Sequence, residues 1–167
     1  MWDNDSNRSE MYINKDTYYC RYTYQSALAA GRSAIASVDH VLTHKDSTSY
    51  AIIRPPGHHS GWKPQPHGFS FLNNVALATS KAIKSQKVKK VAIIDWDVHH
   101  GEGTQNIFKN RADVLYLSLH RFDKGKFFPH IPESGSNFVG EGPGKGFNVN
   151  ICWNLPEKGP GAERKPE

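Results

Sequence analysis

The sequence has few cysteines and no long apolar run, and these absences exclude several classes of protein. Only two cysteines occur, Cys20 and Cys152, and neither lies in a CxxC or a comparable ligand spacing. A disulfide framework and a cysteine zinc site are therefore not indicated. No stretch approaches the roughly 18 apolar residues of a membrane span, and the polar N-terminal stretch lacks the apolar centre of a secretory signal. We expect a soluble, intracellular protein with reduced thiols and no membrane partner.

A nucleic-acid patch is also lacking, although the formal net charge is +5. The densest basic run, KSQKVKK at residues 84–90, has no aromatic residues interleaved with it. It is therefore more typical of a solvated helix end, and we expect no direct binding of nucleic acid. The 167 residues, 37% of them hydrophobic, suit one globular domain with its own core.

The spacing of apolar residues predicts alternating strands and helices. Apolar side chains at three- and four-residue intervals predict helices at residues 22–44 and 72–84, and a short helix suits residues 104–108. Short continuous apolar runs predict buried strands at residues 50–53, 91–95, 114–120 and 146–153. This order favours an α/β fold, an open parallel sheet with helices on both faces.

Polar clusters follow three of the predicted strands. PPGHH comes after residues 50–53, DWDVHHGEG after the strand at 91–95, and LHRFDKGKFFPH at the end of the strand at 114–120. Ligands bind beyond the carboxyl ends of the strands in such sheets, so we expect all three clusters to meet at one edge. The glycine-rich stretch GEGPGKG does not have the spacing of a phosphate-binding loop, and we interpret it as a flexible connection.

The cluster DWDVHHGEG contains candidate metal ligands. Asp97 and His99 are separated by one residue, so in an extended segment both side chains leave the same side and could grip one metal ion. A catalytic zinc normally takes three protein ligands, so a third ligand must come from elsewhere or is missing. The alternative interpretation is a loop held together by hydrogen bonds.

The tandem pair His58-His59 offers a general base and a general acid. Asp95 and Glu102 remain after Asp97 is assigned to the metal, and one carboxylate behind each imidazole would fix its tautomer. A surface pair of histidines is the alternative. For the scattered His67, as for His120 and His130, a core or surface role is the default.

Five ordered motifs together resemble the zinc-dependent histone deacetylase family. They are RPPGHH, GFSFLNN, DWDVHHGEGTQ, LYLSLHRFDKGKFFP and GFNVNICWN. The first and third look like the class II branch, and nearest to its class IIb type, which has tubulin-directed and polyamine-directed members. The resemblance implies a fold of the arginase-deacetylase type, with one zinc ion at the bottom of a channel that admits acetyl-lysine.

The resemblance also implies a role for each matching residue. Asp97 and His99 match zinc ligands, His59 the general base, and His58 its electrostatic or proton-donating partner. Asp95 matches the carboxylate behind His58, and Glu102 the group behind His59.

A structural potassium ion is implied at Asp95, Asp97, His99, Ser118 and Leu119, partly through backbone carbonyls.

Gly68, Phe69 and Phe128 match the channel that surrounds the lysine side chain. The aromatic faces would flank the methylene groups and keep the site dry.

The chain departs from the family pattern in several places. Ser70 stands where many relatives have Cys, and Glu102 where class II members often have Asn or Gln. The third zinc ligand, an aspartate in a later segment, and the carbonyl-polarising tyrosine of a G-G-Y motif are both lacking. We therefore expect residues 1–154 to be the N-terminal part of a deacetylase domain, incomplete on its C-terminal side, followed by a disordered tail at residues 155–167.

Three functional hypotheses follow. The first is zinc-dependent hydrolysis of acetyl-lysine in a protein such as a histone tail or tubulin, with weak or no activity in this chain. The second is a non-catalytic interaction or competitor protein, and the third an acetylpolyamine deacetylase. Expected partners are the acetylated substrate and corepressor or cytoskeletal proteins, and the expected location is the cytoplasm, with the nucleus as a second compartment.

Overall fold

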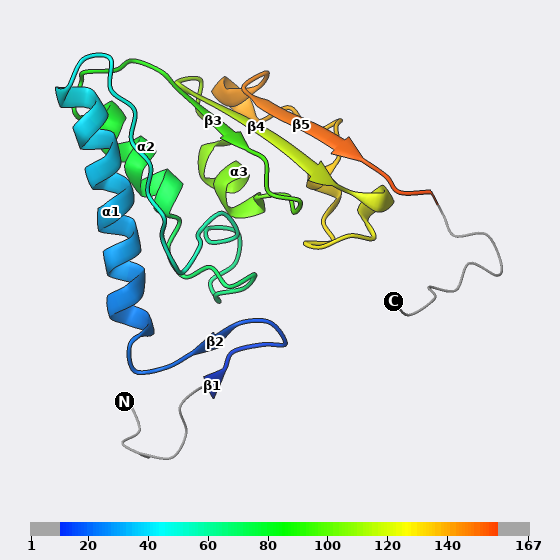
Figure 1. Cartoon of the computed structure of the whole chain (residues 1–167). Helices are drawn as coiled ribbons and strands as arrows, with labels where there is room; N and C mark the ends of the chain where they lie inside the picture. Colours follow the sequence, from blue (N-terminus) through cyan, green and yellow to red (C-terminus); the bar gives the residue numbers. More distant parts are fainter. Residues whose placement is uncertain (1–10, 157–167) are drawn as a thin grey trace.

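The computed structural model describes residues 11–156, which form a small α/β unit (Figure 1). Its regular elements, in chain order, are β1 (Met11–Tyr12), β2 (Tyr18–Tyr19), α1 (Thr23–Thr43), α2 (Asn74–Lys84), β3 (Val91–Asp95), α3 (Glu102–Phe108), β4 (Val114–Arg121) and β5 (Asn148–Trp153). Single 3-10 turns lie at Asp123–Gly125, Pro132–Ser134 and Gly142–Gly144. The helices predicted at residues 22–44, 72–84 and 104–108 are confirmed to within two residues at each end.

The strands β3, β4 and β5 form a parallel sheet in that order. All three were predicted, and the parallel α/β class is confirmed. The register pairs Asp95 with Ser118 and Leu119 with Ile151. Because the strands are parallel, the segments after β3 and β4 leave the sheet at the same edge, as expected for the polar clusters.

One face of the sheet carries the core. Ile93, Val114 and Tyr116 are buried there against Phe108 of α3 and Ala76 of α2. Both helices lie on this one face. The sequence predicts helices on both faces of the sheet, but within residues 11–156 only one face is covered. On the opposite face Ile94 and Ile151 keep 62% and 50% of their surface exposed. The sheet thus presents an uncovered apolar face.

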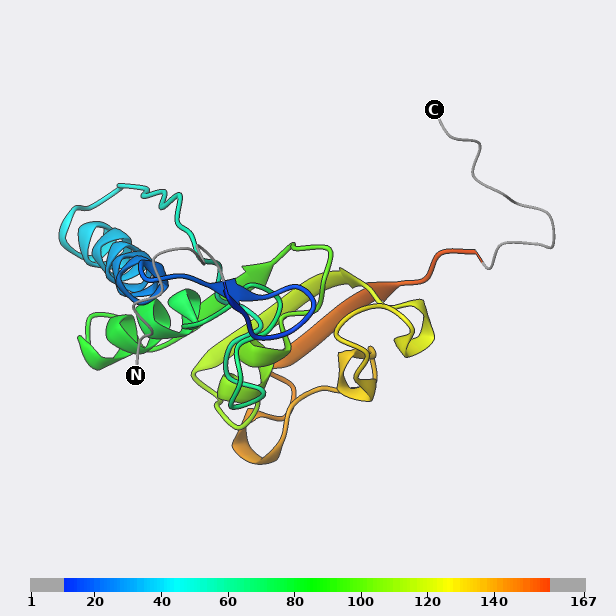
Figure 2. The same ribbon diagram turned by 90° about the horizontal axis from the view of Figure 1, so that it is seen from below.

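Helix α1 packs against α2 and not against the sheet, as the two views agree (Figure 2). The buried positions of α1 are small, namely Ala27, Ala30, Gly31 and Ala34. A Cβ at Gly31 would lie 3.1 Å from Cδ1 of Leu77, so the two helices approach closely where side chains are smallest.

The predicted strand at residues 50–53 is wrong. This segment has no strand assignment, and Tyr50 and Ile52 are 87% and 91% exposed. A β-strand needs a neighbour for its backbone hydrogen bonds, and none of the described strands pairs with this run. Leu155 and Pro156 show no regular structure, and the rest of the expected tail, residues 157–167, lies outside the described residues. Within residues 11–156 no helix is long and apolar enough to cross a bilayer.

The packing of Phe108 gives a test of the core. This side chain is 2% exposed, whereas its neighbour Ile107 is 38% exposed. We expect Phe108→Ala to lower the free energy of unfolding by about 3 kcal/mol, because it leaves a cavity against the sheet. Urea unfolding followed by circular dichroism measures this, with Ile107→Ala as the control at less than about 1 kcal/mol. Equal losses in the two variants would contradict this description of the core.

Candidate active site

The tandem histidines are brought to the end of β3 by hydrogen bonds from other elements. The backbone N–H of Thr104, in the first turn of α3, donates to the carbonyl of His58 at 3.1 Å. Asn73, the residue that caps α2, donates from Nδ2 to the carbonyl of Ser60 at 3.0 Å. The loop that carries the two histidines is therefore anchored at the starts of α2 and α3. The sequence instead predicts that a strand at residues 50–53 holds it.

His58 is paired with Asp95, as predicted. Its Nδ1 lies 3.0 Å from Oδ2 of Asp95, and its Nε2 lies 3.9 Å from Oδ1 of Asp97. Burial disfavours the imidazolium, but the hydrogen bond and charge of Asp95, with smaller contributions from Asp97 and Glu102, raise the pKa of His58 above its ordinary value. The charged form of His58 is therefore more favourable than in a free histidine.

His59 is paired with Glu102, as predicted. Its Nδ1 lies 2.6 Å from Oε2 of Glu102, whose side chain has no solvent exposure. Burial of the ring, with the nearby imidazoles of His58 and His67, lowers the pKa of His59 despite this carboxylate. Burial would raise the pKa of Glu102, but the imidazoles of His59 and His67 outweigh it and lower that pKa to about 2. Glu102 is therefore an ionised acceptor for the Nδ1 proton, and this tautomer leaves Nε2 of His59 as a base.

The two imidazoles lie side by side with their pKa values moved in opposite directions. Their ring centroids are 4.0 Å apart. His58 is held toward the charged form and His59 toward the neutral form. Such a separation is how one site provides an acid and a base at the same pH. The alternative interpretation, a surface pair of histidines, is excluded for His59, which is 3% exposed.

Asp97 and His99 lie together, but they do not form a complete metal site. Oδ1 of Asp97 is 3.0 Å from Nδ1 of His99, and it also accepts a hydrogen bond from the His99 backbone N–H at 2.7 Å. The two side chains are 49% and 36% exposed. A carboxylate and an imidazole are both common zinc ligands. Among residues 11–156, however, no three His, Cys, Asp or Glu side chains are grouped to hold a metal ion. The hydrogen-bonded loop that was the alternative describes this geometry equally well.

Of the three predicted channel residues, Gly68 and Phe128 lie against the histidines. Gly68 has φ +53°, and a Cβ there would overlap the ring of His59. Only glycine combines this backbone conformation with so close an approach. The Phe128 ring meets His59 edge-on at 4.9 Å between centroids, and it lies 5.7 Å from His99.

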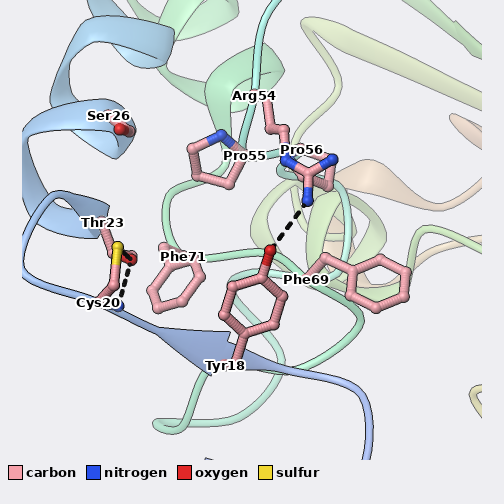
Figure 3. A pocket seen from close by; sticks show the side chains of 9 residues that line it. All are labelled: Tyr18, Cys20, Thr23, Ser26, Arg54, Pro55, Pro56, Phe69 and Phe71. Atoms are coloured by element: carbon pink, nitrogen blue, oxygen red, sulfur yellow. Dashed lines mark hydrogen bonds between the residues drawn. The ribbon is translucent and has the colours of Figure 1, made fainter. Parts of the chain in front are cut away.

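Phe69 lies at one end of a neighbouring cavity of about 530 Å³ and is 56% exposed (Figure 3). The other residues that line this cavity are Tyr18, Cys20, Thr23, Ser26, Arg54, Pro55, Pro56 and Phe71. Its single charged group, the Arg54 guanidinium, donates to the Tyr18 hydroxyl at 3.2 Å. Most of the lining is apolar, and the Thr23 and Ser26 hydroxyls add polar groups to the Arg54–Tyr18 pair. Phe69 directly follows Gly68, which lies against His59.

The predicted potassium ligands include two residues that are neighbours across the sheet. Asp95 and Ser118 are register partners on β3 and β4, and Leu119 follows Ser118 on β4. The Ser118 hydroxyl is 2.9 Å from Nδ1 of His120. This arrangement leaves the potassium site a prediction.

Two residues that the sequence analysis did not assign belong to the site. The hydroxyl of Tyr116 donates to Oδ2 of Asp95 at 2.9 Å, the oxygen that His58 also contacts. His67, expected in a core or surface role, lies with Nε2 3.0 Å from Oε1 of Glu102. Alternate residues of β4 are buried, and this pattern could have indicated that Tyr116 points to the same face of the sheet as the core. Nothing in the spacing of His67 and Glu102 indicates their contact.

Comparison with known proteins gives consistent results. The family described as histone deacetylase domain matches residues 2–161. The rat polyamine deacetylase HDAC10 (Rattus norvegicus) is 44% identical over 86% of this chain and 23% of its own length. The histone deacetylase HDA1 of Candida albicans is 43% identical over 86% of this chain and 17% of its own length. The crystal structure of the HDA15 HD domain superposes with a TM-score of 0.81 at 38% identity, over 88% of this chain and 40% of that one. The chain thus spans about a fifth of the length of the curated relatives it matches.

The low pKa of Glu102 predicts how stability depends on pH. Because the pKa in the folded protein, about 2, lies below the ordinary 4.5, the ionised carboxylate stabilises the fold above pH 4.5. This stabilisation is lost as the pH falls toward 2. Between about pH 5 and pH 3 we expect the wild type to lose about 2 kcal/mol more unfolding free energy than Glu102→Gln. Urea unfolding at several pH values measures both slopes, and parallel slopes would contradict the assigned ion pairs.

Proposed function

The chain belongs to the histone deacetylase family, and on this premise we propose that it carries the acid–base part of a class II-like, zinc-dependent deacetylase site. The proposed reaction is hydrolysis of the acetyl amide of acetyl-lysine in a protein, such as a histone tail or tubulin. One observation carries the proposal. Two adjacent imidazoles, each with Nδ1 on its own carboxylate, lie beside the Asp97–His99 pair with their pKa values driven apart.

The protein's own residues account for the proton movements. Nε2 of His59, kept unprotonated by the Nδ1–H···Glu102 hydrogen bond, accepts a proton from the attacking water. Glu102 then faces a positively charged imidazole and stabilises it. His58, whose protonated form Asp95 favours, is placed to stabilise negative charge on the acetyl oxygen or to donate a proton to the leaving amine.

Zinc is part of the proposal, although residues 11–156 provide only two of its usual three protein ligands. Asp97 and His99 would hold the ion, and a bound zinc ion supplies polarisation of a carbonyl and acidification of a water. With the third ligand missing, we propose weak zinc binding and weak activity for this chain. A structural potassium ion near Asp95 and Ser118 is a further proposal.

A second candidate substrate is an acetylated polyamine. Several similar proteins, at 40–45% identity, are named polyamine deacetylases. The chemistry at the amide is the same, so the acid–base residues do not separate the two substrates. We propose a corepressor or cytoskeletal protein as partner and the cytoplasm, together with the nucleus, as location.

Hydrolysis is tested directly with the 167-residue chain. With zinc added, we expect slow release of acetate from an acetyl-lysine peptide, and slower release from N-acetylspermidine, both measured by mass spectrometry. His59→Ala should reduce the rate by roughly 10²–10⁴-fold, as expected for loss of a general base. His130→Ala, an exposed histidine beside Phe128, is the control and should keep the wild-type rate. A faster reaction with the polyamine would favour the second substrate.

The zinc site is tested separately by zinc content and affinity, for the wild type and for Asp97→Ala. We expect weak binding in the wild type that the substitution abolishes, because it removes one of two ligands. No zinc binding and no acetate release would together contradict the enzymatic proposal and favour a non-catalytic interaction protein. Tight, stoichiometric zinc would instead show a third ligand within this chain.

A further inference from the structure

The carboxylate of Glu102 contacts two histidines, one on each oxygen. Oε2 lies 2.6 Å from Nδ1 of His59, and Oε1 lies 3.0 Å from Nε2 of His67. The second approach is at ion-pair distance but is not aligned as a hydrogen bond. Both atoms are buried, and within residues 11–156 neither has a hydrogen bond to any other group. Buried polar atoms are normally paired, so these two atoms are each other's available partners.

The position of His67 is restricted by its neighbours. Its ring lies 5.7 Å from that of His59 and 5.9 Å from that of Phe128, and its side chain is 14% exposed. Gly68 follows it with φ +53°, and a Cβ at Gly68 would overlap the ring of His59, so the turn after His67 packs directly against that ring. His67 therefore lies next to the rings of His59 and Phe128, with its Nε2 beside the carboxylate of Glu102.

We propose that His67 is a positioning residue for the deacetylase reaction, and that it holds Oε1 of Glu102 so that Oε2 stays directed at Nδ1 of His59. The inference rests on the proposed function, because it concerns the same base. A carboxylate anchored through one oxygen can turn about its terminal bond, whereas one held at both oxygens has a single orientation. That orientation fixes the proton of His59 on Nδ1 and leaves Nε2 as the base.

The test is an NMR measurement of the His59 tautomer in the 167-residue chain. Long-range correlation of ring protons with ¹⁵N in labelled histidines reports which ring nitrogen carries the proton, and His59 is assigned by the loss of its signals in His59→Asn. The short hydrogen bond to Glu102 should also give an Nδ1 proton resonance far downfield of the amides. His67→Leu removes the imidazole nitrogen that lies 3.0 Å from Oε1, and His67→Gln keeps an amide N–H at the same distance along the side chain.

We expect the wild type and His67→Gln to show one tautomer, with the proton on Nδ1 and a sharp downfield resonance. His67→Leu should show a mixture of tautomers and lose most of the intensity of that resonance. His130→Leu, which removes another imidazole beside Phe128, should match the wild type. An unchanged tautomer and resonance in His67→Leu would overturn the proposal, and so would an equal loss in His67→Gln.

If His67→Leu does not fold, as judged by amide dispersion, His67→Asn replaces it. Its amide is one methylene too short to reach Oε1, so loss of the tautomer in His67→Asn but not in His67→Gln supports the proposal, and identical spectra overturn it. The measurement needs no catalysis. Absence of acetate release with the expected spectra would contradict the proposed function alone, whereas acetate release with unchanged spectra would contradict the role of His67 alone.

Discussion

The charge of Glu102, placed without solvent contact at the first turn of α3, is the constraint on which the site depends. A buried carboxylate is stable only with polar or charged partners around it, and here they are imidazoles from a loop that lies 35 to 43 residues earlier in the chain. Because the carboxylate needs these partners, the loop packs against α3. Gly68, which has no side chain, leaves room for the ring of His59. The proton position on His59 therefore depends on how this one charge is accommodated.

Stability and chemistry share residues in this fold. Tyr116 is part of the core on the covered face of the sheet, yet its hydroxyl holds the carboxylate that orients His58. Phe108 at the end of α3 packs in the same core, and the beginning of that helix carries Glu102. The sheet and α3 therefore fix the separation of the two carboxylates, which in turn fixes the separation of the two imidazoles. A rigid support of this kind is what acid–base catalysis requires.

Much of this arrangement could be predicted from the sequence, and the failures have physical reasons. Residues 91–95 and 114–120 carry apolar runs that end in polar clusters, so their strand character was predictable from composition, whereas the pairing of Asp95 with His58 was implied by the family resemblance. Residues 50–53 have the same composition, but a strand depends on a partner that composition does not reveal. The contact of His67 with Glu102 crosses 35 residues and has no local signal. The site residues taken from the family resemblance stay predictions where no geometry bears on them, notably the potassium ligands.

The uncovered face of the sheet has a consequence for the behaviour of the chain in solution. Ile94 and Ile151 face water there, and β3 and β5 are both edge strands, which are templates for pairing between copies. The net charge of +5 opposes such contacts by mutual repulsion, and added salt screens that repulsion over a distance of about 10 Å at 0.1 M. The solubility of the chain therefore depends on two opposing interactions, attraction between uncovered sheet surfaces and repulsion between like net charges. Higher ionic strength weakens the repulsion and so favours aggregation.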